Sequence, residues 1–493
     1  AIILYLGMVV WIGVICSKKN SDVGDFYLGG RKLGPVVTAM SAEASDMSSY
    51  LLMGVPGLAY LTGLADATWT AIGLALGTYL NWLIVAKKIR LYSHGYQAIT
   101  LPDYFSKRFG DDKHVITLIS AALIVIFFIP YTASGFAACG KLFNSLLGFD
   151  YHAAMIVSAV VIVLYCTMGG FLAASTSDLV QSIIMTFALA VVVIFGIVQA
   201  GGMGAVLDNA KALPGYLDMF HTHIAETNSS GDYGFFKIVS TLAWGLGYFG
   251  MPHILVRFMS IEKPSMIKKS SIVAIVWVII SLFSAVMIAY FGRMVMGAEL
   301  LTQGNQKLVF IAMARRFFPA GICGLLLAAI IAASISTADS QLLVASSSFT
   351  ADLYKPFFRK KATEKETLFV GRVLVLSLIA FAIANSKGSG AQAIMDMVEN
   401  AWGAFGASFG PTILLSLFWK RFNYQGAVAD VISGFVIDLG WLLTGMTAST
   451  GIFEIVPGFF GSLVVAIIVA KLTSAPNEKA VAIFEQGTST NAD

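Results

Sequence analysis

The residues from Val36 to Tyr60 have the length of a membrane helix, but the middle of the stretch is polar: Ser41-Ala-Glu-Ala-Ser-Asp-Met-Ser-Ser49. Two carboxylates, Glu43 and Asp46, stand among four serines there. An ionised side chain at bilayer depth costs roughly 3 kcal/mol or more, and it persists mainly where it faces a protein interior, a water-filled cavity or an ion. The stretch therefore predicts a site inside the membrane.

The composition around this stretch is that of a membrane protein. Apolar residues make up 57% of the 493-residue chain, charged residues make up 12%, and the mean hydropathy is +0.79. A soluble domain has about 25% charged residues. The apolar runs are long and continuous rather than alternating, which predicts helices and not a barrel. We therefore expect an all-α polytopic membrane protein.

Thirteen apolar segments are long enough to cross a bilayer, each with about 20 residues. They are 2–17, 36–60, 66–86, 115–140, 152–170, 178–200, 237–258, 271–296, 318–348, 369–386, 398–418, 424–445 and 454–471. Most of the 32 Lys and Arg residues fall in loops on one side if the N-terminus is outside, which is the orientation favoured by the positive-inside rule. The C-terminus is then cytoplasmic, and we expect the polar residues after 472 to form an unstructured tail.

A second predicted span, 237–258, is interrupted like the first. It contains Ala243-Trp-Gly-Leu-Gly-Tyr-Phe-Gly-Met-Pro-His253, with three glycines and a proline within eight residues. Such a segment either unwinds, which leaves backbone groups free for ions and small zwitterions, or forms a kinked packing helix. The two interrupted spans each begin a run of five spans, and the two runs have opposite orientation. This pattern is typical of an inverted-repeat secondary transporter.

The repeat pattern divides the chain into five parts. We expect a peripheral first helix and cytoplasmic loop (1–35), a first five-helix repeat (36–200) and an external loop (201–236). A second, inverted five-helix repeat (237–418) follows, and then two peripheral helices with the cytoplasmic tail (419–493).

Two further polar groups lie within the predicted spans. Ser336, Asp339 and Ser340 share one face of the ninth span, with Thr337 one step round. Hydroxyls with backbone carbonyls suit a hard cation such as sodium, although serines also join helices by hydrogen bonds. Asp178 follows Gly169-Gly-Phe-Leu-Ala-Ala-Ser-Thr-Ser177. It either caps the next helix or belongs to an ion site, and these roles are compatible.

These motifs resemble the sodium/solute symporter family, and within it the branch that transports proline. The resemblance spans essentially the whole chain. The matching stretches are Ser45-Asp-Met-Ser48 with Leu51-Leu-Met-Gly54, Gly169-Gly-Phe-Leu-Ala173 with Asp178 and Gln181, Trp244-Gly-Leu-Gly-Tyr-Phe-Gly250 with Pro252-His-Ile-Leu255, and Ser336-Thr337 with Asp352-Leu-Tyr-Lys355. The resemblance implies a LeuT-like five-plus-five inverted repeat with about 13 transmembrane helices.

The resemblance also implies the site residues. Sodium would bind to backbone carbonyls of Ala44, Met47 and Ala333 and to the hydroxyls of Ser336 and Thr337. Asp46 would couple sodium to transport. A possible second cation site would comprise Asp178, Ser336, Asp339 and Ser340. The substrate pocket would be lined by Met47, Ser48, Tyr50, Tyr131, Trp244, Tyr248 and Pro252.

Some positions depart from the family pattern. Ser49 and Tyr50 stand where Gly-Trp is usual, and Glu43, Met251 and Asp339 replace a Gly, a Gln and a Ser. Tyr50 alters the pocket wall and bears on proline selectivity. Asp339 facing Asp178 would form a stronger cation site or share a proton with it. No family motif gives a role to Glu43.

The resemblance implies sodium-driven uptake of L-proline by alternating access in the bacterial cytoplasmic membrane. The alternatives are a sodium symporter for another small solute, such as a different amino acid or a monocarboxylate, and a membrane sensor that does not transport. An enzyme is not expected, because no nucleophile or metal-ligand set accompanies Asp178 and Asp339. The 4 cysteines lie in or beside apolar runs without metal-site spacing, so we expect buried thiols and no cofactor besides sodium. We expect no nucleic-acid partner and no obligate protein partner.

Overall fold

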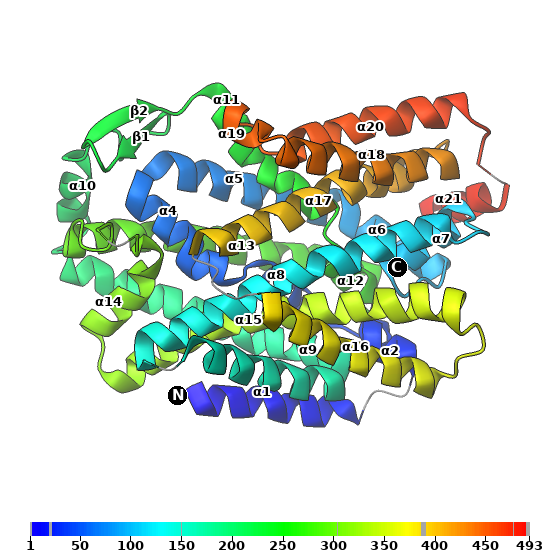
Figure 1. Cartoon of the computed structure of the whole chain (residues 1–493), viewed down its shortest axis with the longest axis horizontal. Helices are drawn as coiled ribbons and strands as arrows, with labels where there is room; N and C mark the ends of the chain where they lie inside the picture. Colours follow the sequence, from blue (N-terminus) through cyan, green and yellow to red (C-terminus); the bar gives the residue numbers. More distant parts are fainter. Residues whose placement is uncertain are drawn as a thin grey trace.

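The computed structural model describes residues 2–18, 22–148, 150–302, 304–385, 391–476 and 478–489. Its helices run mostly along one long axis, and they form a bundle several helices thick (Figure 1). Within these residues the only strands are the hairpin of β1 (His221–Ile224) and β2 (Ser229–Asp232). The prediction of an all-α protein is confirmed.

Each of the thirteen predicted spans falls on helix, although residue 386 of the tenth span lies outside the described part of the chain. In order, the spans correspond to α1 (Ile2–Ser17); α3 (Pro35–Asp46), η2 (Tyr50–Gly54) and α4 (Val55–Thr62); α5 (Leu64–Leu80), η3 (Asn81–Val85) and α6 (Ala86–Gly95); α8 (Val115–Leu147); the two parts of α9 (Tyr151–Gln199); α11 (Phe235–Leu242), η4 (Ala243–Phe249) and α12 (Pro252–Ser260); α13 (Ile267–Met296); α15 (Ala320–Ser347) with η7 (Ser348–Phe358); α16 (Glu364–Asn385); α17 (Ala391–Phe418); α18 (Tyr424–Leu443); and α20 (Ile455–Leu472).

Shorter elements lie at the two ends of the bundle. The hairpin, α10 (Met203–Lys211) and α14 (Val309–Phe317) lie at the left end of Figure 1, while α2 (Val23–Leu28), α7 (Leu101–Phe109) and α21 (Glu478–Ser489) lie toward the right. The short α19 (Met446–Thr450) lies between α18 and α20 in the sequence. Among the described helices, eight are long and apolar enough to cross a membrane by length and composition. Large apolar side chains such as Phe187, Phe283 and Val464 are exposed on them, as lipid contact requires.

The helix α9 carries two predicted spans because it is sharply bent. Gly170, inside it, has φ 57° and ψ −149°, a conformation that disfavours any residue with a side chain. A Cβ at this position would also lie 2.6 Å from the carbonyl oxygen of Phe26. The bend redirects the chain after Gly170, and the second part of α9 can then reach the first broken helix.

The two interrupted spans are broken helices, and the alternative of a kinked packing helix, raised for the second span, is wrong. The helix α3 ends at Asp46, and Met47 has φ −75° and ψ 75° before the chain resumes as the π-helical η2. In the second span, the 3-10 helix η4 ends at Phe249, and Met251 is extended with φ −73° and ψ 110°. Pro252 then occupies the first turn of α12, where its missing N–H costs no hydrogen bond.

The prediction of an unstructured tail is wrong for part of the segment, because Glu478–Ser489 form the helix α21. The ring of Phe484 stacks on that of Tyr92 with centroids 5.5 Å apart, and the guanidinium of Arg108 lies 5.0 Å from the same ring. These contacts with α6 and α7 hold the helix to the bundle. The four cysteines are all buried free thiols, as predicted.

Candidate functional site

The first polar cluster joins the end of α3 to the middle of α15. The hydroxyl of Ser336 donates to the carbonyl oxygen of Ala44 at 2.7 Å and lies 3.1 Å from that of Ala333. Thr337 Oγ1 also lies 3.2 Å from the Ala333 carbonyl oxygen. Four of the five predicted sodium ligands are thus brought together by direct contacts, and the fifth, Met47, lies at the break three residues after Ala44. Carbonyl and hydroxyl oxygens are the ligands that hard cations prefer.

Asp46 is the last residue of α3, and its carboxylate contacts the other broken helix. Tyr248 of η4 donates a hydrogen bond from its hydroxyl to Asp46 Oδ2. Both side chains are buried. The carboxylate has no ion pair among the residues that the structure describes. Asp46 therefore links the two broken helices, and no side chain in the described set neutralises it with a salt bridge.

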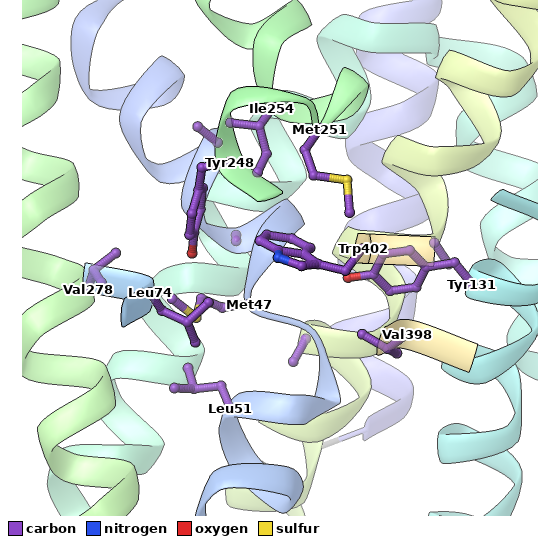
Figure 2. Close-up of a cluster of buried hydrophobic side chains, with 14 of the residues drawn as sticks. Met47, Leu51, Leu74, Tyr131, Tyr248, Met251, Ile254, Val278, Val398 and Trp402 are labelled. Carbon is purple, nitrogen blue, oxygen red and sulfur yellow. The ribbon is translucent and has the colours of Figure 1, made fainter. Parts of the chain in front are cut away.

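A small pocket opens beside this contact. It is lined by Asp46, Met47, Ser48, Tyr50, Leu74, Tyr131, Trp244, Val398 and Trp402. Figure 2 shows Met47 at the unwound stretch of the first broken helix, with Tyr248 above it and Trp402 and Tyr131 to the right. The cavity volume is about 20 Å³, which is room for about one water molecule. The walls must therefore move apart before an amino acid can enter.

Four aromatic side chains, from Tyr50, Tyr131, Trp244 and Trp402, form part of this wall. The rings of Tyr50 and Trp244 are stacked, with centroids 5.9 Å apart and planes 17° apart. Trp402 packs edge-on against Tyr248 with centroids 5.1 Å apart. Its indole N–H donates to the carbonyl oxygen of Trp244 at 2.8 Å. Apolar and aromatic walls with a few polar groups, such as Asp46 and Ser48 here, are typical of pockets for small molecules.

Five of the seven predicted substrate residues line the pocket, whereas Tyr248 stands behind Asp46 and Pro252 does not line it. Three lining residues were not predicted: Leu74, Val398 and Trp402. A tryptophan among small residues in Glu399-Asn-Ala-Trp-Gly-Ala404 was a usable signal for the last of these. The other two are ordinary apolar residues, and only the packing of α5 and α17 identifies them.

The predicted second cation site is one buried hydrogen-bonded network. Its members are Ser41 from α3, Tyr165 and Asp178 from α9, Arg257 from α12, and Ser336, Asp339 and Ser340 from α15. Asp178 Oδ2 accepts from the Ser41 hydroxyl at 2.7 Å. Tyr165 donates its hydroxyl to Asp339, and Ser340 donates to the same carboxylate at 2.9 Å.

The guanidinium of Arg257 occupies the middle of this network. It lies 3.3 Å from Asp178 Oδ2, 3.1 Å from Ser41 Oγ and within hydrogen-bonding distance of Ser340. Arg257 and Asp178 are both fully buried. Arg257 was not among the predicted site residues, and α12 carries it inside the bundle. One side-chain cation thus stands between two carboxylates.

Asp178 does not cap a helix. Because α9 breaks at Gly170, Asp178 lies two turns inside the second part of that helix, where the backbone amides are already paired. The cap prediction is therefore wrong, and its carboxylate is held by Ser41 and Arg257 instead.

Glu43, which no motif explained, faces away from the pocket. Its Oε1 accepts a hydrogen bond from the indole N–H of Trp82 at 2.8 Å. Trp82 packs edge-on against Phe258 of α12, with ring centroids 4.5 Å apart. Glu43 therefore ties α3 to η3, one turn before the break.

Known proteins place this architecture in a class. The sequence matches the sodium:solute symporter family over residues 26–434. It is 41% identical to the osmoregulated proline transporter OpuE of Bacillus subtilis over 98% of this chain and 96% of that protein. It is 42% identical to the high-affinity proline transporter PutP of Bacillus subtilis over 95% and 96%, and 39% identical to a sodium/proline symporter of Staphylococcus aureus over 96% and 92%.

Solved structures share the fold at low sequence identity. The chain superposes on a Na⁺-coupled sialic acid symporter in a substrate-bound outward-open state with a TM-score of 0.78 and 18% identity, over 97% of this chain and 98% of that one. It superposes on Mhp1, a nucleobase-cation-symport-1 family transporter, with a TM-score of 0.56 and 13% identity, over 94% and 98%. The fold is the LeuT-like five-plus-five inverted repeat that the sequence predicted.

Two broken helices that meet at a small pocket, within this fold, define a secondary transporter and not an enzyme. The chain belongs to the sodium:solute symporter family. It is a multi-pass membrane protein whose coupling ion is sodium.

Proposed function

We propose that this chain couples the inward movement of sodium to the uptake of L-proline by alternating access. The observation that carries the proposal is the position of Asp46. It ends the helix that presents the Ala44 carbonyl to Ser336, it lines the pocket, and it accepts from Tyr248 of the other repeat. Relatives at about 40% identity over nearly the whole chain are named proline transporters.

Sodium binds first, to the carbonyls of Ala44, Met47 and Ala333 and the hydroxyls of Ser336 and Thr337. Its charge is balanced by Asp46, whose negative charge lies nearby and has no salt-bridge partner among the described side chains. Sodium therefore holds the unwound stretch of the first broken helix in the shape that the pocket needs.

Proline then enters the pocket between Tyr50, Tyr131 and Trp244. Its carboxylate and ring nitrogen pair with backbone groups and hydroxyls at the break, including Ser48, while the aromatic rings enclose its apolar ring. Tyr248 affects the binding of both sodium and proline because its hydroxyl donates a hydrogen bond to Asp46. Pro252 acts indirectly, by starting α12 directly after the unwound segment.

The membrane orientation follows the charge distribution. The N-terminus lies outside and the C-terminus in the cytoplasm, in the cytoplasmic membrane of a bacterium. Residues 36–200 and 237–418 form the two repeats that rock about the pocket, and residues 1–35, 201–236 and 419–493 are peripheral. A membrane potential drives the positive load inward with about 2.3 kcal/mol per charge per 100 mV.

The Arg257 network has a different task. With two carboxylates and one guanidinium, it carries one excess negative charge when both acids are ionised. We propose that Asp178, Ser336, Asp339 and Ser340 offer this charge to a second cation in the course of transport. The stoichiometry of sodium to proline, measured from paired isotope fluxes, tests this step.

Uptake of radiolabelled proline into proteoliposomes tests the main proposal. We expect accumulation under an inward sodium gradient and none when potassium replaces sodium. Equal uptake in the two salts contradicts sodium coupling. Competition of proline uptake by a panel of amino acids and monocarboxylates tests the alternative that another small solute is the substrate. The test matters for this chain because Tyr50 alters the pocket wall. Counterflow of labelled proline excludes a non-transporting sensor.

A further inference from the structure

Two carboxylates outside the pocket are buried side by side. Asp438 lies on α18, and Glu454 directly precedes α20; they are 3% and 1% exposed. Both face Gly403 of α17, where a Cβ would lie 2.9 Å from Asp438 Oδ1 and 3.3 Å from Glu454 Cγ. The two acids thus share one small space between three helices.

Each of these acids has an oxygen without a hydrogen bond. Asp438 Oδ1 and Glu454 Oε1 are buried and have no partner among the described residues. The other oxygen of Glu454 accepts from the Thr447 hydroxyl at 2.8 Å. A buried acceptor left unpaired costs about 1–3 kcal/mol, and more when it is charged. The structure therefore contains two unpaired buried carboxylate oxygens in the same small space beside Gly403.

No described cationic side chain neutralises the pair. In the elements packed around it, α19 has no charged residue, and Lys237 of α11 lies over the ring of Tyr233, 4.8 Å from its centroid. The other charged side chains that the structure describes on these helices are Glu399 on α17, Asp430 on α18, which accepts from Thr412, and Lys471 in the last turn of α20, at the other end of that helix. Two ionised carboxylates here would repel each other in a medium of low dielectric.

We propose that Asp438 and Glu454 bind one proton between them, as an acid–carboxylate hydrogen bond. The proton adds to one carboxylate oxygen, and that O–H donates to the other carboxylate. One proton therefore pairs both unpaired oxygens and removes one of the two negative charges. A metal ion would need several more oxygen ligands than the two that are unpaired here.

The pair lies directly behind the pocket wall. Phe453, next to Glu454, has its ring 5.2 Å from that of Trp244, and its backbone N–H donates to the Ser240 hydroxyl at 2.7 Å. Gly403, next to Trp402, faces both acids. The shared proton therefore holds the Phe453–Glu454 segment against η4 and α17. When the proton leaves, repulsion between the acids loosens the wall behind Trp244.

Thermal unfolding of the purified full-length protein, without proline and without sodium, tests the site itself. Because ionisation of the pair adds repulsion that the unfolded chain lacks, we expect the Tm to fall as pH rises, by roughly 2 °C or more from mildly acidic to mildly alkaline pH. The amide introduced by Asp438→Asn donates to Glu454 at every pH. The Tm of this variant should therefore fall less with rising pH and match or exceed that of the unchanged protein at alkaline pH.

Asp430→Asn is the matched control, since it removes a buried carboxylate of the same helix that is held by Thr412. Its Tm should fall more with rising pH than that of Asp438→Asn. Should Asp438→Asn fold poorly, Glu454→Gln supplies the same test from the other side. An equal fall in all variants contradicts the proposal, and so does a recovery of the Tm by calcium at alkaline pH that Asp438→Asn abolishes, which would assign the site to a metal ion.

Infrared difference spectroscopy reads the proton directly. Raising the pH should remove the carbonyl band of the shared acid proton in the unchanged protein and in the control Asp430→Asn. The same band should not change with pH in Asp438→Asn or in Glu454→Gln. Its persistence in both variants contradicts the assignment. The effect on the pocket rests on the proposed function. If proline uptake depends on pH through this pair, Asp438→Asn should flatten the dependence of uptake on pH. Neither the unfolding test nor the infrared test needs proline transport, so their failure is distinct from failure of that function.

Discussion

Two buried carboxylates differ in what balances their charge: Asp46, at the end of α3, and Asp178, which meets α3 through Ser41. Asp178 meets the guanidinium of Arg257 and the hydroxyl of Ser41, and its negative charge is balanced by the chain itself. Asp46 has a hydroxyl partner, Tyr248, and no ion pair among the described residues. A buried charge that the chain neutralises serves to hold helices in place, whereas one that it leaves unbalanced needs a cation from outside. The Arg257–Asp178 pair is therefore a structural hub and Asp46 the proposed coupling site, and the excess negative charge of the Arg257 network belongs to Asp339.

The largest effect, on protein stability, is expected from removing the guanidinium of Arg257. Arg257→Met leaves Asp178 and Asp339 without a countercharge, and breaking a buried pair by removing one partner typically costs about 3–5 kcal/mol. We expect a marked fall in the Tm of the purified protein. Adding Asp178→Asn and Asp339→Asn to the same chain should restore much of the loss. An equally low Tm in the triple variant contradicts the view that unbalanced charge is the cause.

The next largest effect is expected at Asp46. A unit charge a few ångströms from a cation contributes about 2–3 kcal/mol at an effective dielectric of about 20, so Asp46→Asn should raise the sodium concentration for half-maximal proline uptake roughly 30-fold or more. Asp430→Asn, at a buried acid of the peripheral α18, is the control and should leave it unchanged. An unaltered sodium requirement in Asp46→Asn would place the coupling site elsewhere.

A smaller effect on the same carboxylate is expected from Tyr248→Phe. The substitution removes the O–H that donates to Asp46 and keeps the ring that packs on Trp402. A hydrogen bond to a charged group contributes about 1.5 kcal/mol, so the half-saturating concentrations of sodium and of proline should both rise about tenfold. A change in the proline value alone would mean that the tyrosine acts only as pocket wall.

The smallest effect is expected at the pocket wall. Trp402→Phe removes the N–H that donates to the Trp244 carbonyl and keeps an aromatic ring. A neutral hydrogen bond contributes roughly 1 kcal/mol, which corresponds to an approximately fivefold rise in half-saturating proline. The sodium requirement should stay the same, because Trp402 contacts neither Asp46 nor the Ser336 cluster in any hydrogen bond. A parallel shift in both values would show that wall and ion site are not separable.

Local chemistry made the broken helices predictable. Glycine and proline at Gly245–Pro252 act on the backbone where they stand, and carboxylates in an apolar stretch are costly wherever the helix packs. The same holds for Ser336 and Thr337, whose spacing puts them beside the Ala333 carbonyl on their own helix. The cap assigned to Asp178 failed because the bend at Gly170, eight residues earlier, decides where that helix begins.

The sequence by itself determined a helical membrane protein of the five-plus-five inverted-repeat fold and predicted two broken helices, and its resemblance to a family supplied the proposed sodium ligands. Hydrophobic length, helix-breaking residues and the identity of the ligands are local properties, and each can be read without knowing its neighbours. Only the tertiary structure decided that Arg257 balances Asp178, that Trp402 closes the pocket, and that Asp46 has no salt-bridge partner in the described chain. Charge balance depends on which helices meet, and the polar stretch at Ser41–Ser49 contributes Ser41 to the hub and Asp46 to the proposed coupling site.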